Sequence, residues 1–302
     1  SWSHGSEAED LPAGLVAKTY TLTVTDSKGC SVTEEISITE TEEMTISETH
    51  SNYSGYGVSC NGDANGWIDI LVTGGTGNYN YEWSNGAIIE DISFLDAGIY
   101  TVLVTDENGC TISKTVEITE AEEMQISEVH SNYLGYSISC NGDADGWIDV
   151  TVTGGTESYT YSWSNGETTQ DLNNIEAGFY LLIATDANGC AVSIEVEITE
   201  PTLIDITETY SNYAGYGVSC NGENNGWIDI EVTGGDGEYE YAWIGLDGTY
   251  VSVSSSISNL ESGTYMLIVS DERGCVESVS VDITEADQME ISEVHSNYTG
   301  YG

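Results

Sequence analysis

The chain has 302 residues, with 52 acidic against 4 basic side chains, which gives a formal net charge of −48 at pH 7. This scarcity of Lys and Arg excludes nucleic acid and anionic membrane surfaces as partners, because binding to both depends on basic side chains that neutralise phosphate. No run approaches the roughly 20 apolar residues of a membrane span. Aromatic residues make up 10% of the chain, Gly occurs 34 times and Pro twice. This composition favours an all-β protein with many tight turns over an acidic disordered chain.

The sequence repeats itself with a period of 80 residues. Ser-Asn-Tyr, Ser-Cys-Asn-Gly, Asp-x-x-Gly-Cys and Ile-Thr-Glu recur in this order. The third full unit carries a five-residue insertion around 245–255. We expect the natural protein to be longer, because the chain starts and stops inside a unit. The predicted units are the C-terminal part of a truncated repeat (1–41), repeat 1 (42–121), repeat 2 (122–202), repeat 3 (203–286) and the start of a further repeat (287–302).

Within a repeat the side-chain period is two, which is typical of strands. In repeat 1, residues 67–72 place Ile68, Ile70 and Val72 on one face, and 79–83 and 100–104 alternate in the same way. Turn residues such as Gly74-Gly75 separate these runs. Six or seven short strands per repeat, with a Trp in the middle third on the inward face, predict an immunoglobulin-like β-sandwich.

Several motifs of each repeat resemble the SprB repeat of gliding-motility adhesins. They are the run from Val58 to Gly75, Tyr-x-Trp-Ser-Asn-Gly (81–86), Leu-x-Ala-Gly-x-Tyr (95–100) and Val-Thr-Asp-x-Asn-Gly-Cys (104–110). The resemblance implies a very large adhesin on the outer surface of gliding bacteria, exported by type IX secretion. It also implies the gliding and secretion machinery and neighbouring repeats as partners. The chain departs from the expected pattern where a small residue is replaced by Trp67, Trp147 and Trp227.

The repeats are joined by very short linkers at the Ile-Thr-Glu boundaries. Short linkers poor in Gly and Ser restrict bending, so we expect an elongated rod. Strands of about 20 Å plus loops predict that each repeat adds on the order of 35–45 Å.

The cysteines occupy two regular positions, which suggests one disulfide per repeat in an oxidising, extracellular setting. Pairing within repeats is favoured, because it closes a loop inside one sandwich and stabilises it by about 3–4 kcal/mol. This pairing joins Cys60–Cys110, Cys140–Cys190 and Cys220–Cys275 and leaves Cys30 unpaired in this fragment. Pairing across the junctions would instead join Cys30–Cys60, Cys110–Cys140 and Cys190–Cys220 and leave Cys275 unpaired.

An Asn/Asp-rich segment of each repeat has the spacing of a calcium loop, with oxygens at positions 1, 3, 5 and 9 and Gly at 6. The bidentate Glu of position 12 is missing, since Val72 stands there, and a turn leading into a strand requires the same residue types. Both interpretations stay open, and the turn needs no cofactor. The candidate Ca²⁺ ligands are Asn61, Asp63, Asn65, Asp69, Asn141, Asp143, Asp145, Asp149, Asn221, Glu223, Asn225 and Asp229.

An outward Trp beside Tyr and Asp is the best candidate for a ligand face, because exposed aromatics next to carboxylates suit sugar stacking. The alternative is that the Tyr-containing segment, or a neighbouring repeat, covers the Trp. The candidate residues are Trp67, Tyr53, Tyr56, Trp147, Tyr133, Tyr136, Trp227, Tyr213 and Tyr216.

These patterns predict a structural and adhesive role rather than catalysis. His50 and His130 share one repeat position that Tyr210 fills in repeat 3, and imidazole acid–base chemistry does not survive that replacement. We therefore expect no enzyme, but an extended spacer within a surface adhesin that contacts an extracellular surface. The second hypothesis is an array of glycan-binding modules that grip polysaccharide through the Trp/Tyr/Asp face.

Overall fold

The computed structural model describes the chain except residues 4, 8–12, 246–247, 249 and 295–302. The period-two pattern produces strands: in β4 (Gly66–Thr73) every second side chain is buried, so that Ile68, Ile70 and Val72 face inward. Neither the predicted insertion in repeat 3 nor the predicted start of a further repeat lies wholly within the described residues. Over those residues the secondary structure is strand and turn, and no helix that could span a membrane is found there.

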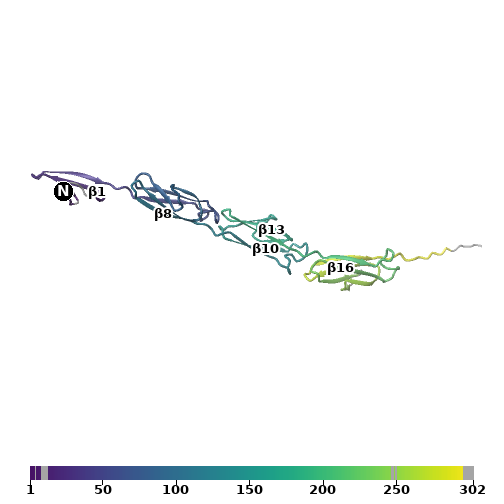
Figure 1. The fold of residues 1–302 in the computed structure, drawn as a ribbon. Coiled ribbons are helices and arrows are strands. Elements are labelled where there is room, and N and C mark those ends of the chain that lie inside the picture. Colours follow the sequence, from purple (N-terminus) through teal and green to yellow (C-terminus); the bar gives the residue numbers. More distant parts are fainter. Residues whose placement is uncertain (4, 8–12, 246–247, 249, 295–302) are drawn as a thin grey trace, which may run out of the picture. The chain divides into compact units, whose positions relative to one another are not determined.

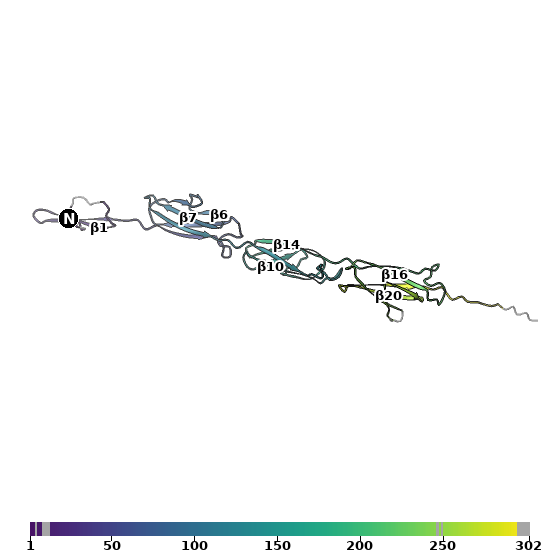
Figure 2. The ribbon, with the colours of Figure 1, turned by 60° about the horizontal axis from the view of Figure 1, so that its bottom comes forward.

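Repeat 1 is built from two three-stranded antiparallel sheets. One has the order β3-β4-β6, with β3 at Thr45–His50 and β6 at Ile92–Leu95. The other has the order β5-β7-β8, with β5 at Asn80–Trp83, β7 at Gly98–Thr105 and β8 at Thr111–Ile118 (Figures 1 and 2). Apolar side chains from both sheets form one core. The prediction of an all-β sandwich is confirmed.

Repeats 2 and 3 use the same strand order. Repeat 2 has the sheets β12-β10-β9 and β11-β13-β14. Its strands are β9 (Gln125–His130), β10 (Gly146–Thr153), β11 (Thr160–Trp163), β12 (Leu172–Ile175), β13 (Gly178–Thr185) and β14 (Ala191–Ile198). Repeat 3 has β15-β16-β19 and β18-β17-β20-β21, where β18 is an added strand in the insertion. Its strands are β15 (Asp205–Tyr210), β16 (Gly226–Thr233), β17 (Tyr239–Ile244), β18 (Tyr250–Ser252), β19 (Ser256–Leu260), β20 (Gly263–Asp271) and β21 (Val276–Ile283).

The residues before repeat 1 form the hairpin of β1 (Lys18–Thr25) and β2 (Ser31–Ile38). Its tip, residues 26–30, has the same Asp-x-x-Gly-Cys sequence as the tips between β7 and β8, β13 and β14, and β20 and β21. The hairpin before repeat 1 therefore corresponds to the last hairpin of each repeat.

A buried Trp anchors each core. Trp83, Trp163 and Trp243 are 2%, 3% and 0% exposed. Each indole Nε1 donates a 2.9 Å hydrogen bond to a backbone carbonyl, of Ile89, Thr169 and Ser254 respectively. The buried ring thus keeps its polar atom satisfied, as the interior requires.

The chain divides by its contacts into two units. The first comprises Ser1–Met124 with Gly154–Ser158 and Asp186–Cys190, and the second comprises Gln125–Thr153, Tyr159–Thr185 and Ala191–Gly302. The first unit thus contains repeat 1 with two loops of repeat 2, and the second contains the body of repeat 2 with repeat 3. Each unit includes one complete junction between consecutive repeats.

Candidate functional site at the repeat junctions

The two disulfides of the structure join consecutive repeats. Cys60 pairs with Cys190, with the Cα atoms 5.6 Å apart, and Cys140 pairs with Cys275, at 5.4 Å. In both cases the first cysteine of one repeat bonds the second cysteine of the next. Cys30, Cys110 and Cys220 form no disulfide and are exposed.

Both predicted pairing schemes are therefore wrong. Cys60–Cys110, Cys140–Cys190 and Cys220–Cys275 do not form within repeats, and Cys30–Cys60, Cys110–Cys140 and Cys190–Cys220 do not form across junctions. Of the individual assignments, the structure agrees with the prediction only in leaving Cys30 unpaired.

The positions of the cysteines along β8 explain the error. Cys110 directly precedes β8, whereas Cys60 lies by its far end, since Val58 N–H bonds the Thr119 carbonyl at 3.1 Å and Asn61 Nδ2 donates to Ala121 O at 2.9 Å. A strand of eight residues is about 26 Å long, and a disulfide needs Cα atoms within about 7 Å. The second cysteine thus marks the end at which the chain enters a repeat, and the first cysteine marks the end at which it leaves.

The hairpin loop of residues 186–190 is held in shape by one buried carboxylate. Asp186 Oδ1 accepts hydrogen bonds from the N–H groups of Asn188 (2.9 Å) and Cys190 (2.8 Å). Its Oδ2 accepts the Thr156 N–H at 2.8 Å. Thr156 Oγ1 in turn accepts a hydrogen bond from Asn188 Nδ2 at 2.9 Å. These contacts fix both the cysteine and the amide side chain that meet repeat 1.

The loop of repeat 1 that receives this hairpin is also fixed by its own side chains. Ser59 N–H donates to Asn65 Oδ1 at 3.0 Å, and Ser59 Oγ donates to Asp63 Oδ2 at 2.7 Å. Gly62 N–H donates to Glu120 Oε2 at 2.8 Å. The Asn/Asp-rich segment therefore acts as a turn that holds Cys60 at the end of the sandwich.

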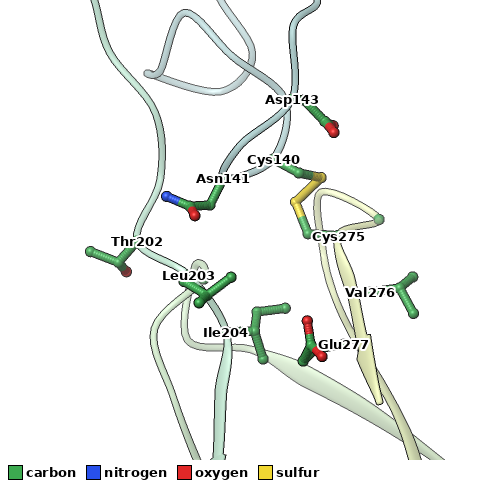
Figure 3. A pocket seen from close by; sticks show the side chains of 11 residues that line it. Cys140, Asn141, Asp143, Thr202, Leu203, Ile204, Cys275, Val276 and Glu277 are labelled. Atoms are coloured by element: carbon green, nitrogen blue, oxygen red, sulfur yellow. A yellow bond between two sulfur atoms is a disulfide. The ribbon is translucent and has the colours of Figure 1, made fainter. Parts of the chain in front are cut away.

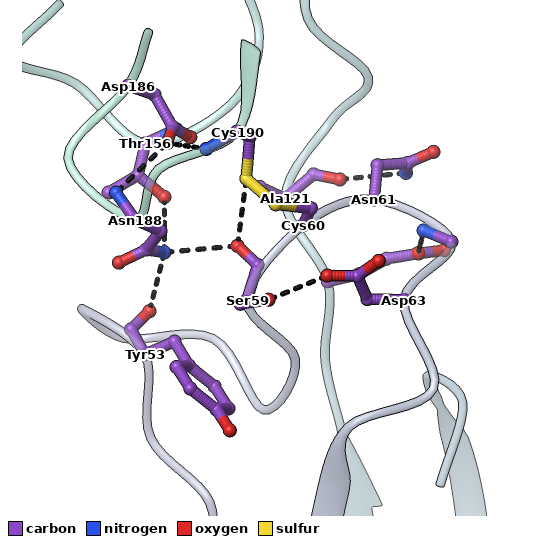
Figure 4. The surroundings of a disulfide bond; sticks show 12 residues. Tyr53, Ser59, Cys60, Asn61, Asp63, Ala121, Thr156, Asp186, Asn188 and Cys190 are labelled. Carbon is purple, nitrogen blue, oxygen red and sulfur yellow. Dashed lines mark hydrogen bonds between the residues drawn. A yellow bond between two sulfur atoms is a disulfide. The ribbon is translucent and has the colours of Figure 1, made fainter. Parts of the chain in front are cut away.

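Asn188 supplies the polar contacts of the junction beside the disulfide. Its Nδ2 donates to the carbonyls of Tyr53 (3.1 Å) and Ser59 (3.3 Å), and its Oδ1 accepts from Ser54 Oγ at 2.8 Å. Figure 4 shows Asn188 beside the Cys60–Cys190 disulfide, between the carbonyls of Tyr53 and Ser59. One amide thus satisfies several polar groups of the preceding repeat.

Repeat 3 makes the corresponding contact with an arginine. The guanidinium of Arg273 donates to the carbonyls of Tyr133 and Leu134 and lies 4.9 Å from the centre of the Tyr136 ring. The site therefore tolerates either an amide or a guanidinium, because what it requires is an N–H donor for the carbonyls of the Tyr-containing turn.

A small cavity of about 280 Å³ opens beside the second disulfide. Leu203, Ile204, Val276 and Glu277 of repeat 3 line it together with Asn141 of repeat 2 (Figure 3). Its mixed lining and modest size are those of a gap where two domains meet rather than of a substrate pocket.

The candidate calcium ligands are engaged in the turns. Asn141 Nδ2 donates to the Pro201 carbonyl at 3.0 Å, and Asn221 Nδ2 donates to the Ala286 carbonyl at 2.9 Å. Asp145 Oδ1 and Asn225 Oδ1 each accept a backbone N–H at 3.1 Å. Asp69, Asp149 and Asp229 lie on the strands, while Asp143 accepts from Ser139 Oγ and Glu223 N–H bonds the Cys220 carbonyl. Among the described residues no group of three or more His, Cys, Asp or Glu could hold a metal, and calcium binding stays a prediction.

We expect millimolar Ca²⁺ to raise the melting temperature no more than NaCl of equal ionic strength, because some of the loop oxygens, among them those of Asp63, Asn65 and Asp145, already accept hydrogen bonds. Both salts should raise it by screening the repulsion within a chain of charge −48. Differential scanning calorimetry in the two salts makes the comparison. A rise of several degrees that only Ca²⁺ produces would show that the loops bind the ion.

The predicted ligand face is only partly a free surface. Trp67, Trp147 and Trp227 are 41%, 36% and 41% exposed on the outer side of their strands. Tyr53 pairs with Tyr56 in a tight turn, as do Tyr133 with Tyr136 and Tyr213 with Tyr216. The carbonyls of Tyr53 and Tyr133 accept hydrogen bonds from the next repeat. The Tyr-containing turn is therefore part of the junction, while ligand binding by the Trp stays a prediction.

Sequence reasoning missed the role of Asn188 and Arg273. Their position, the third of Asp-x-x-Gly-Cys, holds an N–H donor in each copy, with Lys28 and Asn108 in the others. A donor at the same position of every copy was the feature of the sequence that could have indicated this role.

Three segments of the chain are similar to a known repeat family. The SprB repeat family matches residues 58–88, 137–168 and 218–248. No curated protein matches the chain. Similar solved structures include the N-terminal eight Ig domains of Down Syndrome Cell Adhesion Molecule, with 10% identity, a TM-score of 0.29 and coverage of 89% of this chain and 51% of that chain.

Two further similar solved structures are those of an adhesin and of a large adhesion protein. A Ca²⁺-stabilized adhesin that helps an Antarctic bacterium bind ice is 17% identical, with a TM-score of 0.38 and coverage of 88% of this chain and 80% of that chain. A tetra-tandem repeat in the extending region of a large adhesion protein is 14% identical, with a TM-score of 0.25 and coverage of 91% and 83%.

Proposed function

We propose, from the match of three of its segments to the SprB repeat family, that the chain is an extended segment of a cell-surface adhesin that spaces binding regions away from the cell. We further infer that the adhesin serves gliding motility and surface attachment, reaches the outer surface by type IX secretion, and works with the gliding machinery. The family match supports both inferences. The proposed role is structural, and no residue is assigned a catalytic part.

The junction between repeats 1 and 2 is the observation that carries the proposal. Only residues 119–124 separate β8 from β9, and three of their backbone carbonyls are bound. Thr119 O accepts from Gly57 N–H, Ala121 O from Asn61, and Glu122 O from Gly155 N–H at 2.7 Å. With the disulfide added, the linker has few free torsions, which is what a spacer requires.

Glycines at the entry end of repeats 1 and 2 are required by close contacts with the segment that leads into each repeat. A Cβ on Gly74 would lie 2.1 Å from the Glu43 carbonyl oxygen, and Gly74 has φ = +80°. Gly154 repeats both features against Glu123. The Gly-Gly motif thus lets the incoming linker lie directly on the repeat that follows it.

Small-angle X-ray scattering of the oxidised protein tests the proposal. We expect a maximum dimension that corresponds to on the order of 35–45 Å per repeat, because a spacer has to hold its repeats in line. Reduction should broaden the distribution of distances between repeats, since the linker alone then restrains them. A compact particle in the oxidised state would contradict the spacer function. A scattering profile that reduction leaves unchanged would show that the disulfides do not restrain the repeats.

A glycan-binding array is the second candidate, and the exposure of Trp67, Trp147 and Trp227 favours it. Binding of polysaccharide should shift the Trp fluorescence of the wild type and leave a Trp147→Ala, Trp67→Ala, Trp227→Ala variant unchanged. A panel of polysaccharides without any shift would leave the spacer as the sole function.

A further inference from the structure

The outer face of the β3-β4-β6 sheet in repeat 1 carries a second exposed aromatic side chain beside Trp67. Phe94 of β6 is 84% exposed. Trp67 pairs with Ser93 and Gly66 pairs with Leu95, so Phe94 is the extra residue of a β-bulge between these two pairs. The two middle residues of β6 are exposed and the two outer ones are buried, so both middle side chains point outward. Trp67 and Phe94 therefore lie on the same face, on neighbouring strands.

The backbone of Phe94 does not suit a Phe. Its φ of +59° is left-handed, and the same bulge of repeats 2 and 3 holds Asn174 (+55°) and Asn259 (+59°). Asn tolerates this conformation because its short polar side chain can hydrogen-bond locally, which a Phe cannot do. The sister repeats form the bulge with Asn, and Phe94 gains no burial in return. A role in binding explains this side chain better than a role in folding.

A third apolar side chain extends the face along β4. Leu71 is 61% exposed, and the alternation of β4 places it on the same side as Trp67 and Asp69. The matching residues are Thr151 in repeat 2 and Glu231 in repeat 3. The three repeats thus share the Trp and the Asp, while repeat 1 surrounds them with apolar side chains and the other two with polar ones.

This face is the surface of a complete repeat. The bulge lies near the exit end of repeat 1, since a Cβ on Gly66 would lie 3.1 Å from Cγ2 of Ile118, the last residue of β8. The Cys60–Cys190 disulfide closes the junction at this end. Phe94 is exposed although the junction beside it is complete, so its exposure does not come from an interrupted repeat.

The chemistry of the face indicates its ligand. A net charge of −48 repels anionic polymers. A basic protein would look for several carboxylates around an apolar centre, yet Asp69 is the single carboxylate at the outward positions of β3, β4 and β6, which are all described. Hydroxyl groups surround it, since Thr49 pairs with Asp69 and Ser47 pairs with Leu71. Aromatic rings among hydroxyls and one carboxylate suit the C–H faces and hydroxyl groups of a neutral sugar.

We propose that the outer face of repeat 1, formed by Trp67, Asp69, Leu71 and Phe94, binds an uncharged polysaccharide whose sugar rings present C–H faces, such as a β-linked glucan, and binds it more tightly than the matching faces of repeats 2 and 3. The inference rests on the second candidate function, the glycan-binding array, and names its ligand class and its strongest repeat. The two aromatic rings contact the sugar faces, and Asp69 accepts hydrogen bonds from sugar hydroxyls.

Affinity electrophoresis in native gels that contain hydroxyethyl cellulose tests the proposal, because a bound polysaccharide slows the acidic protein. Phe94→Asn gives repeat 1 the residue of its sister repeats and should weaken binding about tenfold, since one stacking contact is lost. Its melting temperature should not fall, because Asn fits the left-handed backbone. Carboxymethyl cellulose has the same backbone with anionic groups and should bind at least about tenfold more weakly at low salt.

The chain offers matched controls for both aromatic side chains. Phe179→Asn removes the other Phe of the chain, which is 65% exposed on β13 of repeat 2, and should leave binding unchanged. Trp67 and Trp227 are both 41% exposed. Trp67→Ala should weaken binding about tenfold, whereas Trp227→Ala should change it less than about twofold, because Glu231 and Asn259 flank Trp227 in place of Leu71 and Phe94.

Equal losses for Trp67→Ala and Trp227→Ala, with none for Phe94→Asn, would overturn the proposal and leave an array of equivalent modules. Tighter binding to carboxymethyl cellulose would overturn the ligand class. Binding to poly-L-lysine that depends on Phe94, without binding to hydroxyethyl cellulose, would assign the face to a basic protein instead. A wild type that no polysaccharide slows would overturn the glycan-binding array together with this proposal, and the spacer function, which scattering measures, would stand.

Discussion

The variant Cys140→Ser/Cys275→Ser lowers the free energy of unfolding of repeats 2 and 3 by about 5 kcal/mol. The bridge closes a loop whose ends are 135 residues apart, and the chain-entropy estimate for a loop of this size is about 5 kcal/mol. For two linked repeats that corresponds to a fall in melting temperature of about 10 °C or more. Calorimetry and urea denaturation followed by circular dichroism measure the change.

Cys30→Ser and Cys110→Ser are the matched controls, because they remove exposed cysteines that form no bond in the structure. Both variants should have the melting temperature of the wild type. A double variant as stable as these controls would mean that the two repeats unfold independently of their covalent link.

Replacing a core Trp has the second large effect. Trp163→Ala removes a 3% exposed ring and leaves the Thr169 carbonyl without its donor, so repeat 2 should lose about 3–5 kcal/mol. Trp147→Ala removes the same side chain from the outer face of β10, where it is 36% exposed, and should cost about 1 kcal/mol or less. Urea denaturation of both variants gives the comparison.

The two Trp variants carry the same change in the same repeat, so their difference isolates burial. Equal losses would show that the outer Trp is covered as well as the inner one. A small loss for Trp163→Ala would place the core of the sandwich elsewhere.

The sandwich could be predicted because the residue pattern of each strand indicates which of its faces is buried. In β4 and β10 Ile or Val occupies every second position from Ile68 and Ile148 onward, and these positions are the buried or half-buried ones of each strand. The Gly-rich turns separate these strands at regular intervals. Local patterns of this kind need no knowledge of what the strand packs against.

The junction could not be predicted, because it depends on which end of the sandwich each cysteine occupies. Cys60 and Cys110 are equally regular in the sequence, yet they lie beyond opposite ends of β8. Their separation follows from the path of the chain through two sheets, and spacing alone does not contain that path. The Asn/Asp-rich segment was ambiguous for a related reason. A turn and a calcium loop use the same residue types, and the sequence does not show which groups their oxygens contact.

The two disulfides enclose overlapping stretches of chain, since Cys140 lies within the loop from Cys60 to Cys190 and Cys190 lies within the loop from Cys140 to Cys275. A protease that cuts one peptide bond anywhere between Cys60 and Cys275 therefore leaves the two fragments covalently attached. Disulfides confined to single repeats would leave every linker as a point where one cut separates the chain. A surface protein exposed to the proteases of its neighbours would in this way survive damage to individual strands without losing whatever lies beyond them.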